Sequence, residues 1–160
     1  MRRLQWWWPA VAAMAATAVI LVAPGAAFAD VDTIPADVTV PVQNDPATDT
    51  KSSSVPYWMT SGDCTMYPDS TIVLSRPDRH GNATISWHAT TFTSHTNDGD
   101  VWYASFFTAR ADGTRLGGVF LESPLMIFRY TPYTFDISIP TYIDPDTYDQ
   151  IGQIHWVGSC

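Results

Sequence analysis

Apolar and polar residues alternate along much of the chain after residue 56. Between Asn82 and His95, for example, Ile85, Trp87 and Ala89 alternate with polar residues. A repeat of two residues places such side chains on one face of a β-strand. Similar patterns predict strands at 71–75, 101–110, 115–122, 125–130, 133–139 and 148–157, whereas no segment in this region has the 3.6-residue repeat of a helix.

Turn residues separate these predicted strands at short intervals. The sequence Asn-Asp-Gly-Asp at 97–100 predicts a hairpin, because Asp-Gly accepts the positive φ angles of a tight turn. Residues 111–114 predict a second turn, and prolines interrupt the later connections. Short strands at this spacing are typical of all-β folds. We therefore expect residues 56–160 to form a single antiparallel β-sandwich or small barrel.

Cys64 and Cys160 are the two cysteines of the chain. In an oxidising compartment an even number of cysteines predicts a disulfide, which here would close the predicted domain. A loop of this length stabilises a fold by about 4–5 kcal/mol in the chain-entropy description.

The first 29 residues have the layout of a cleavable signal peptide. Two arginines form a basic start, a long uncharged stretch follows, and Ala27 and Ala29 match a signal peptidase site. An uncleaved membrane anchor is the alternative, since the uncharged stretch is long enough to span a bilayer. No basic cluster follows it, which favours cleavage before Asp30 and a secreted, extracellular protein.

Residues 30–55 differ in composition from the rest of the mature chain. They contain three prolines, several aspartates and threonines, and no aromatic residue. Such a segment buries too little apolar surface to offset the entropy lost on ordering, so we expect a disordered, flexible leader. Within it, Ile34, Val38, Val40 and Val42 form an extended apolar stretch of the kind that adds to a partner's sheet edge. These four residues are candidate partner-binding positions, although a plain flexible linker remains the alternative.

The mature chain is strongly acidic. All 16 acidic residues follow the predicted cleavage site, against six of the eight basic residues, for a net charge near −10. Nucleic acids and anionic membranes attract basic surfaces. We therefore expect neither as a partner after signal cleavage, and a basic protein partner fits the charge better.

Few residues suggest catalysis. The chain has no phosphate-binding glycine loop and neither of the hydrolase motifs G-x-S-x-G and H-E-x-x-H, so no cofactor or metal is expected. A small secreted ribonuclease-like hydrolase is the enzyme alternative, because such enzymes combine glutamate, arginine and histidine. Its candidate residues are Glu122, Arg129, His88 and His155, but their spacing does not match those enzymes.

Exposed aromatic residues offer a binding function instead. The mature chain has more tyrosine and tryptophan than a small core accommodates, and these residues are enriched at recognition surfaces. Tyr57, Trp58 and Trp156 are the candidates for such a surface. They would anchor a protein partner or stack on sugars, so a carbohydrate-binding module is the second interpretation.

The layout resembles a small secreted actinomycete β-sandwich protein, and in particular the adaptor subunit of umbrella toxin particles. The resemblance rests on the extended leader at 34–42 and the strands from Pro56 to Cys160. It implies an adaptor that joins other subunits of a secreted toxin complex and whose N-terminal segment inserts into a partner. We therefore expect a secreted, non-enzymatic protein-binding module.

Overall fold

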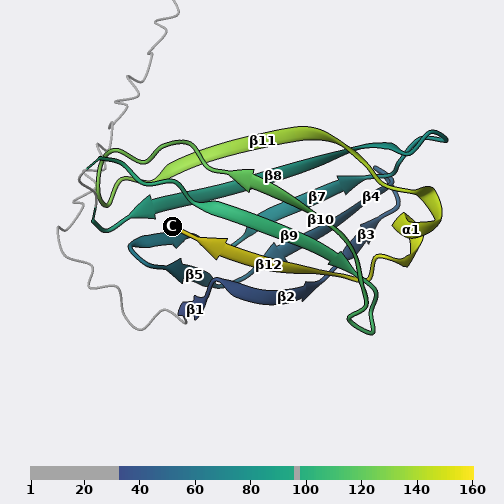
Figure 1. Cartoon of the computed structure of the whole chain (residues 1–160), viewed down its shortest axis with the longest axis horizontal. Coiled ribbons are helices and arrows are strands. Elements are labelled where there is room, and N and C mark those ends of the chain that lie inside the picture. Colours follow the sequence, from purple (N-terminus) through teal and green to yellow (C-terminus); the bar gives the residue numbers. More distant parts are fainter. Residues whose placement is uncertain (1–32, 96–97) are drawn as a thin grey trace, which may run out of the picture.

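The computed structural model describes residues 33–95 and 98–160 (Figure 1). The predicted signal peptide at 1–29 lies outside the described residues. The strands and the single helix within them are β1 (Thr33–Pro35), β2 (Asp37–Pro41), β3 (Gln43–Asp45), β4 (Thr50–Val55), β5 (Trp58–Ser61), β6 (Cys64–Met66), β7 (Ser70–Ser75), β8 (Asn82–Thr93), β9 (Tyr103–Ala109), β10 (Arg115–Glu122), β11 (Tyr133–Tyr142), α1 (Pro145–Gln150) and β12 (Gln153–Ser159).

The strands form two sheets. In sheet A, β11 pairs with one edge of the long strand β8, and β6 and β7 pair with successive parts of its other edge. Strands β5 and β1 continue the sheet from β6, and β4 and β3 continue it from β7. Sheet B has the order β10-β9-β12-β2. All these pairs are antiparallel except β1–β5, so the predicted antiparallel all-β fold is confirmed.

The predicted disulfide is also confirmed. Cys64 on β6 is bonded to Cys160 after β12, with Cα atoms 5.8 Å apart and a sequence separation of 96. The bridge therefore joins sheet A to the end of sheet B.

Aromatic side chains from both sheets meet in the core. The ring of Trp87 on β8 contacts Phe106 and Phe135 edge-on, and Phe106 contacts Trp156 at a centroid distance of 4.8 Å. The prediction of Trp156 as a surface residue is wrong, since only 2% of this residue is exposed. Alternation along β12 turns Trp156 inward together with Ile154.

The described part of the predicted leader is also folded, which corrects the expectation of a flexible segment. Strand β2 pairs with β12, and β4 lies between β7 and β3 in sheet A. The polar composition suggested disorder, but the inward polar side chains of β4 form hydrogen bonds inside the domain. Lys51 Nζ donates to the carbonyl of Ile151 at 2.7 Å, and Ser53 accepts a hydrogen bond from Trp156 Nε1.

Three local expectations also differ from the structure. Strands β8 and β9 lie in different sheets and so do not pair as the predicted hairpin, whereas residues 111–114 do connect the paired strands β9 and β10. The segment 125–130 is a loop. Helix α1 replaces the start of the predicted last strand, because Asp144 caps the Thr147 amide and Pro145 suits a first helical turn.

No helix in the described residues is long and apolar enough to cross a bilayer.

Candidate functional site

The connection between β10 and β11 displays a run of large apolar side chains. Leu125, Ile127, Phe128 and Tyr130 are exposed by 52, 52, 63 and 67%. We call residues 124–130 the apolar loop. It lies at the end of the molecule opposite α1 (Figure 1). These four residues are half of the large apolar side chains that are exposed in the described part of the chain.

The backbone of the apolar loop is held by hydrogen bonds on both sides. Met126 is fully buried, and its amide and carbonyl pair with Asp100 at 2.8 and 3.1 Å. The Tyr133 hydroxyl accepts the amides of Ile127 and Phe128 at 3.1 and 2.9 Å. The exposed side chains therefore project from a fixed backbone.

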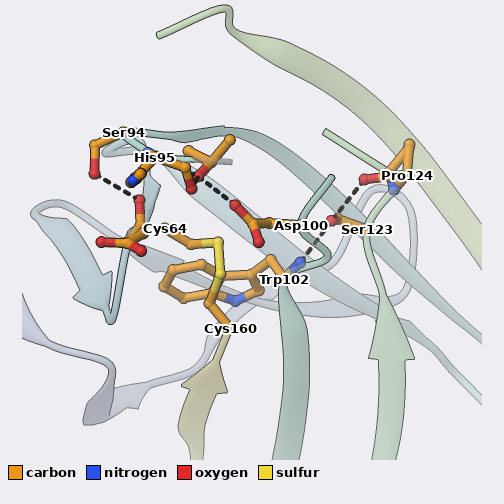
Figure 2. Close-up of a disulfide and its surroundings, with 10 residues drawn as sticks. Cys64, Ser94, His95, Asp100, Trp102, Ser123, Pro124 and Cys160 are labelled. Carbon is orange, nitrogen blue, oxygen red and sulfur yellow. Dashed lines mark hydrogen bonds between the residues drawn. A yellow bond between two sulfur atoms is a disulfide. The ribbon is translucent and has the colours of Figure 1, made fainter. Parts of the chain in front are cut away.

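The disulfide braces the base of the apolar loop. Figure 2 shows the Cys64–Cys160 bond near Asp100, whose carboxylate oxygen lies within 4.8 Å of both sulfur atoms. The Trp102 amide donates to the Ser123 hydroxyl at 2.9 Å, and the Trp102 carbonyl accepts the Ser123 amide at 2.9 Å. Ser123 directly precedes the apolar loop and Asp100 pairs with Met126 within it, so the segment from Asp100 to Trp102, beside the disulfide, holds the loop.

Among the described residues, one group of side chains has the spacing of a metal site: Cys64, Asp100 and Cys160. One carboxylate oxygen of Asp100 and the two sulfur atoms lie within 4.8 Å of one another. Both sulfur atoms are bonded to each other, and a metal requires free thiolates. The cluster is therefore a disulfide with a neighbouring carboxylate, which accepts the Thr93 hydroxyl at 2.5 Å.

Tyr130 joins the apolar loop to a group of rings on the outer face of sheet A. Its ring lies 6.3 Å from Phe92, which in turn contacts Tyr67 and Trp58. We call these four residues the aromatic cluster. Tyr130 has a φ angle of 57°, unusual for a bulky residue, and its amide donates to the Thr93 carbonyl at 2.7 Å. The fold thus holds Tyr130 in a disfavoured conformation at the junction of the two surfaces.

Two of the three predicted surface residues lie at this end. Tyr57 is exposed, and Trp58 is half-buried in the aromatic cluster with its ring 4.3 Å from Tyr67. Trp156 is not brought near them because it fills the core.

The predicted leader residues have a different environment from the one expected. Val38, Val40 and Val42 are half-buried and pack against the domain's own core. The backbone of Ile34 pairs with Met59 in β5. Their extended conformation was predicted correctly, but the sheet that these valines complete belongs to the same chain.

The residues of the enzyme alternative do not assemble into one site. His88 lies on the outer face of sheet A and its Nδ1 is 2.7 Å from Asp136. His155 lies on the outer face of sheet B, bonded to Asp37. Arg129 belongs to the apolar loop, and Glu122 ends β10. The two histidines thus face away from each other across the sandwich.

A group of charged and aromatic side chains near α1, with Lys51 and Tyr148 buried, has a structural role. Lys51 Nζ lies 5.1 Å from the centre of the Tyr148 ring, and Arg76 lies over the same ring at 5.0 Å. Burial lowers the pKa of Lys51 and raises the pKa of Tyr148. Because Lys51 also donates to carbonyls at the end of α1, the cluster fixes the helix against β4.

Comparisons with protein-family models, curated proteins and solved structures find no match to this chain. The apolar loop was not predicted from the sequence, because residues 125–130 were assigned to a strand. Two signals point to a loop: the apolar residues at 125–128 are consecutive rather than alternating, and Pro124 and Pro132 bracket them.

Proposed function

We propose that this protein is a secreted, non-enzymatic module that binds an extracellular protein partner through its apolar loop. The observation that carries the proposal is the exposure of Leu125, Ile127, Phe128 and Tyr130 on a hydrogen-bonded backbone. Exposed apolar groups of this kind mark interaction surfaces in soluble proteins. The concrete form we propose is an adaptor subunit of an extracellular assembly.

Burial of the apolar loop in a partner would contribute several kcal/mol to binding. Complete burial of one large apolar side chain contributes about 1.5–3 kcal/mol. The four side chains are already about half covered, so burying the rest would contribute roughly 3–6 kcal/mol together. Because the backbone is held by Asp100 and Tyr133, little further entropy is lost when a partner docks.

The composition of the apolar loop favours a protein over a carbohydrate. Leu125 and Ile127 have aliphatic side chains, which fill pockets in a protein partner but offer no flat face for a sugar ring. The tryptophan at this end, Trp58, lies against Tyr67 and is half-buried. One ring face that a sugar would need is therefore covered.

The charge of the chain favours a protein over an anionic membrane. The full sequence has a formal net charge of −8, and Arg129 is the single charged residue of the apolar loop. A surface that docks on anionic lipids normally has several basic residues. A partner with complementary positive charge would instead be attracted at long range.

The test is affinity capture with the tagged mature chain from the culture supernatant of the producing organism. The decisive variant is the double substitution Ile127→Ser and Phe128→Ser, and the matched control is Phe120→Ser, which alters another exposed ring, on β10. We expect the wild type and the control to recover the same protein, and the double variant to recover at least tenfold less of it. Equal thermal unfolding midpoints would show that all three chains are folded.

Three outcomes would contradict the proposal. The first is recovery of no specific protein by the wild type, and the second is equal recovery by the double variant. The third is loop-dependent binding to phosphatidylglycerol vesicles without protein capture, which would assign the loop to a membrane. A glycan array that binds the wild type but not Trp58→Ala would support the carbohydrate alternative in its place.

A further inference from the structure

Strand β10 is one of the two edge strands of sheet B. Strand β10 pairs with β9 through one edge, and its other edge pairs with no strand among the described residues. Natural edge strands are usually guarded by charged residues, prolines or bulges. β10 has a bulge near Arg115, but the residues from Gly117 to Leu121 continue in regular register with no charge or proline.

A cavity lies beside this open edge. Its volume is about 250 Å³, and Leu116 and Val119 of β10 line one side. Ile143, which follows β11, lines another part, and the core residues Leu74 and Ile154 are also among the lining. The two sheets are therefore not sealed between β10 and β11, and the gap reaches apolar core side chains.

The opposite side of the sandwich shows what closes such a gap. There the chain segment around β2 bonds to both sheets: the Ala36 amide donates to Thr60 of sheet A at 3.1 Å, and the Ala36 carbonyl accepts the Gly158 amide of sheet B at 2.7 Å. Val40 and Val42 from the same segment pack on the core. An extended strand with alternating apolar residues thus seals one side, and no described strand seals the other.

The charges near the open side favour a basic occupant. Asp144 lies in the cavity lining and Glu122 ends β10. The guanidinium of Arg115 lies 3.6 Å from the centre of the Phe107 ring, which draws the one cation of β10 onto that ring. The chain as a whole has a formal net charge of −8.

We propose that the β10 edge accepts an extended segment of a basic protein partner. The segment pairs with β10 as a fifth strand of sheet B and places one large apolar side chain in the cavity. A dry cavity of about 150 Å³ already holds a benzene-sized guest, so the cavity accommodates a leucine or phenylalanine side chain. Sheet-edge addition of this kind gains affinity from main-chain hydrogen bonds and specificity from side-chain pockets. This contact is separate from the apolar loop, so an adaptor would have two binding surfaces.

The probe is a nine-residue peptide that alternates leucine or valine with lysine and threonine, titrated into the mature protein and followed by amide NMR shifts. Gly117→Leu is the blocking variant. A Cβ at Gly117 meets only the Thr108 hydroxyl at 3.5 Å, so the new side chain has room to occupy the cavity without strain. Thr39→Leu adds the same side chain to the far edge strand of sheet B and is the control.

We expect shifts confined to residues 116–122 and their neighbours with a Kd below about 1 mM. Affinity should fall at least tenfold in Gly117→Leu and at least fivefold when aspartate replaces lysine in the peptide, and it should not change in Thr39→Leu. The Ile127→Ser and Phe128→Ser double variant should also bind the peptide normally, so this result is independent of the proposed function.

The proposal is overturned if the shifts are absent at 1 mM peptide, lie at the apolar loop, or persist unchanged in Gly117→Leu. A concentration-dependent dimer in analytical ultracentrifugation that Gly117→Leu abolishes would assign the edge to a second copy of this chain, and it would likewise overturn a partner peptide as the occupant.

Discussion

Replacing Trp156 with alanine distinguishes a core tryptophan from a surface one. The side chain is 2% exposed, lies edge-on to Phe106, and donates from Nε1 to the Ser53 hydroxyl at 3.2 Å. A buried tryptophan removes about 150–250 Å² from water, which corresponds to roughly 4–6 kcal/mol at 25 cal/mol per Å². Large-to-alanine substitutions of core aromatics cost about 3–5 kcal/mol. We therefore expect Trp156→Ala to lower the free energy of unfolding by about 4 kcal/mol.

The assay is urea denaturation followed by the fluorescence of the remaining tryptophans. With a slope of about 2 kcal/mol/M, a loss of 4 kcal/mol lowers the midpoint by about 2 M. Phe120→Ala is the control, because this ring is 53% exposed and its loss should change stability by no more than about 1 kcal/mol. An unchanged midpoint for Trp156→Ala, accompanied by weaker ligand binding, would refute the placement of Trp156 in the core.

Three further predictions concern stability. Lys51→Met should destabilise the fold by about 1–3 kcal/mol in urea titrations, because the Ile151 carbonyl loses a charged donor, and a midpoint equal to that of the wild type would contradict this role. Replacing Cys64 and Cys160 together by serine should lower the free energy of unfolding by about 4 kcal/mol in a non-reducing titration, and a loss below about 1 kcal/mol would argue against a stabilising bridge. Because burial raises the pKa of Tyr148 above its unfolded value near 10, the unfolded chain loses this proton first, and stability falls as the pH rises above about 10. Tyr148→Phe should remove that part of the alkaline loss in thermal melts between pH 9 and 11, and parallel pH profiles of the two proteins would contradict it.

Alternating apolar and polar residues predicted those strands that bury one face in the core. Strands β8, β9 and β10 follow from local patterns, as in β8, where Ile85, Trp87 and Ala89 point into the core. The disulfide follows from the presence of two cysteines in a chain with a predicted export signal. In β12 the same alternation places Trp156 and Ile154 on one face. The sequence alone does not show that this face, and not the other, meets sheet A.

The errors arose where distant residues decide the outcome. The segment Thr50–Val55 has a polar composition, but Lys51 is satisfied by a carbonyl 100 positions away and Ser53 by a tryptophan 103 positions away. Neither partner is visible in a local window. Likewise, the exposure of Phe128 depends on the pairing of Met126 with Asp100, and strands β9 and β10 separate these two residues in the sequence.

The most direct test of partner binding through the apolar loop is site-specific photo-crosslinking. Benzoylphenylalanine would replace Phe128 in one chain and Arg79 in another. Arg79 is exposed and lies just before β8 begins. The Thr93 carbonyl, which accepts the Tyr130 amide of the apolar loop, lies at the other end of β8. After irradiation in culture supernatant, the account predicts one discrete protein adduct from position 128 and none from position 79. Absence of an adduct at 128, or the same adduct from both positions, would contradict the assignment of the apolar loop as the partner-binding site.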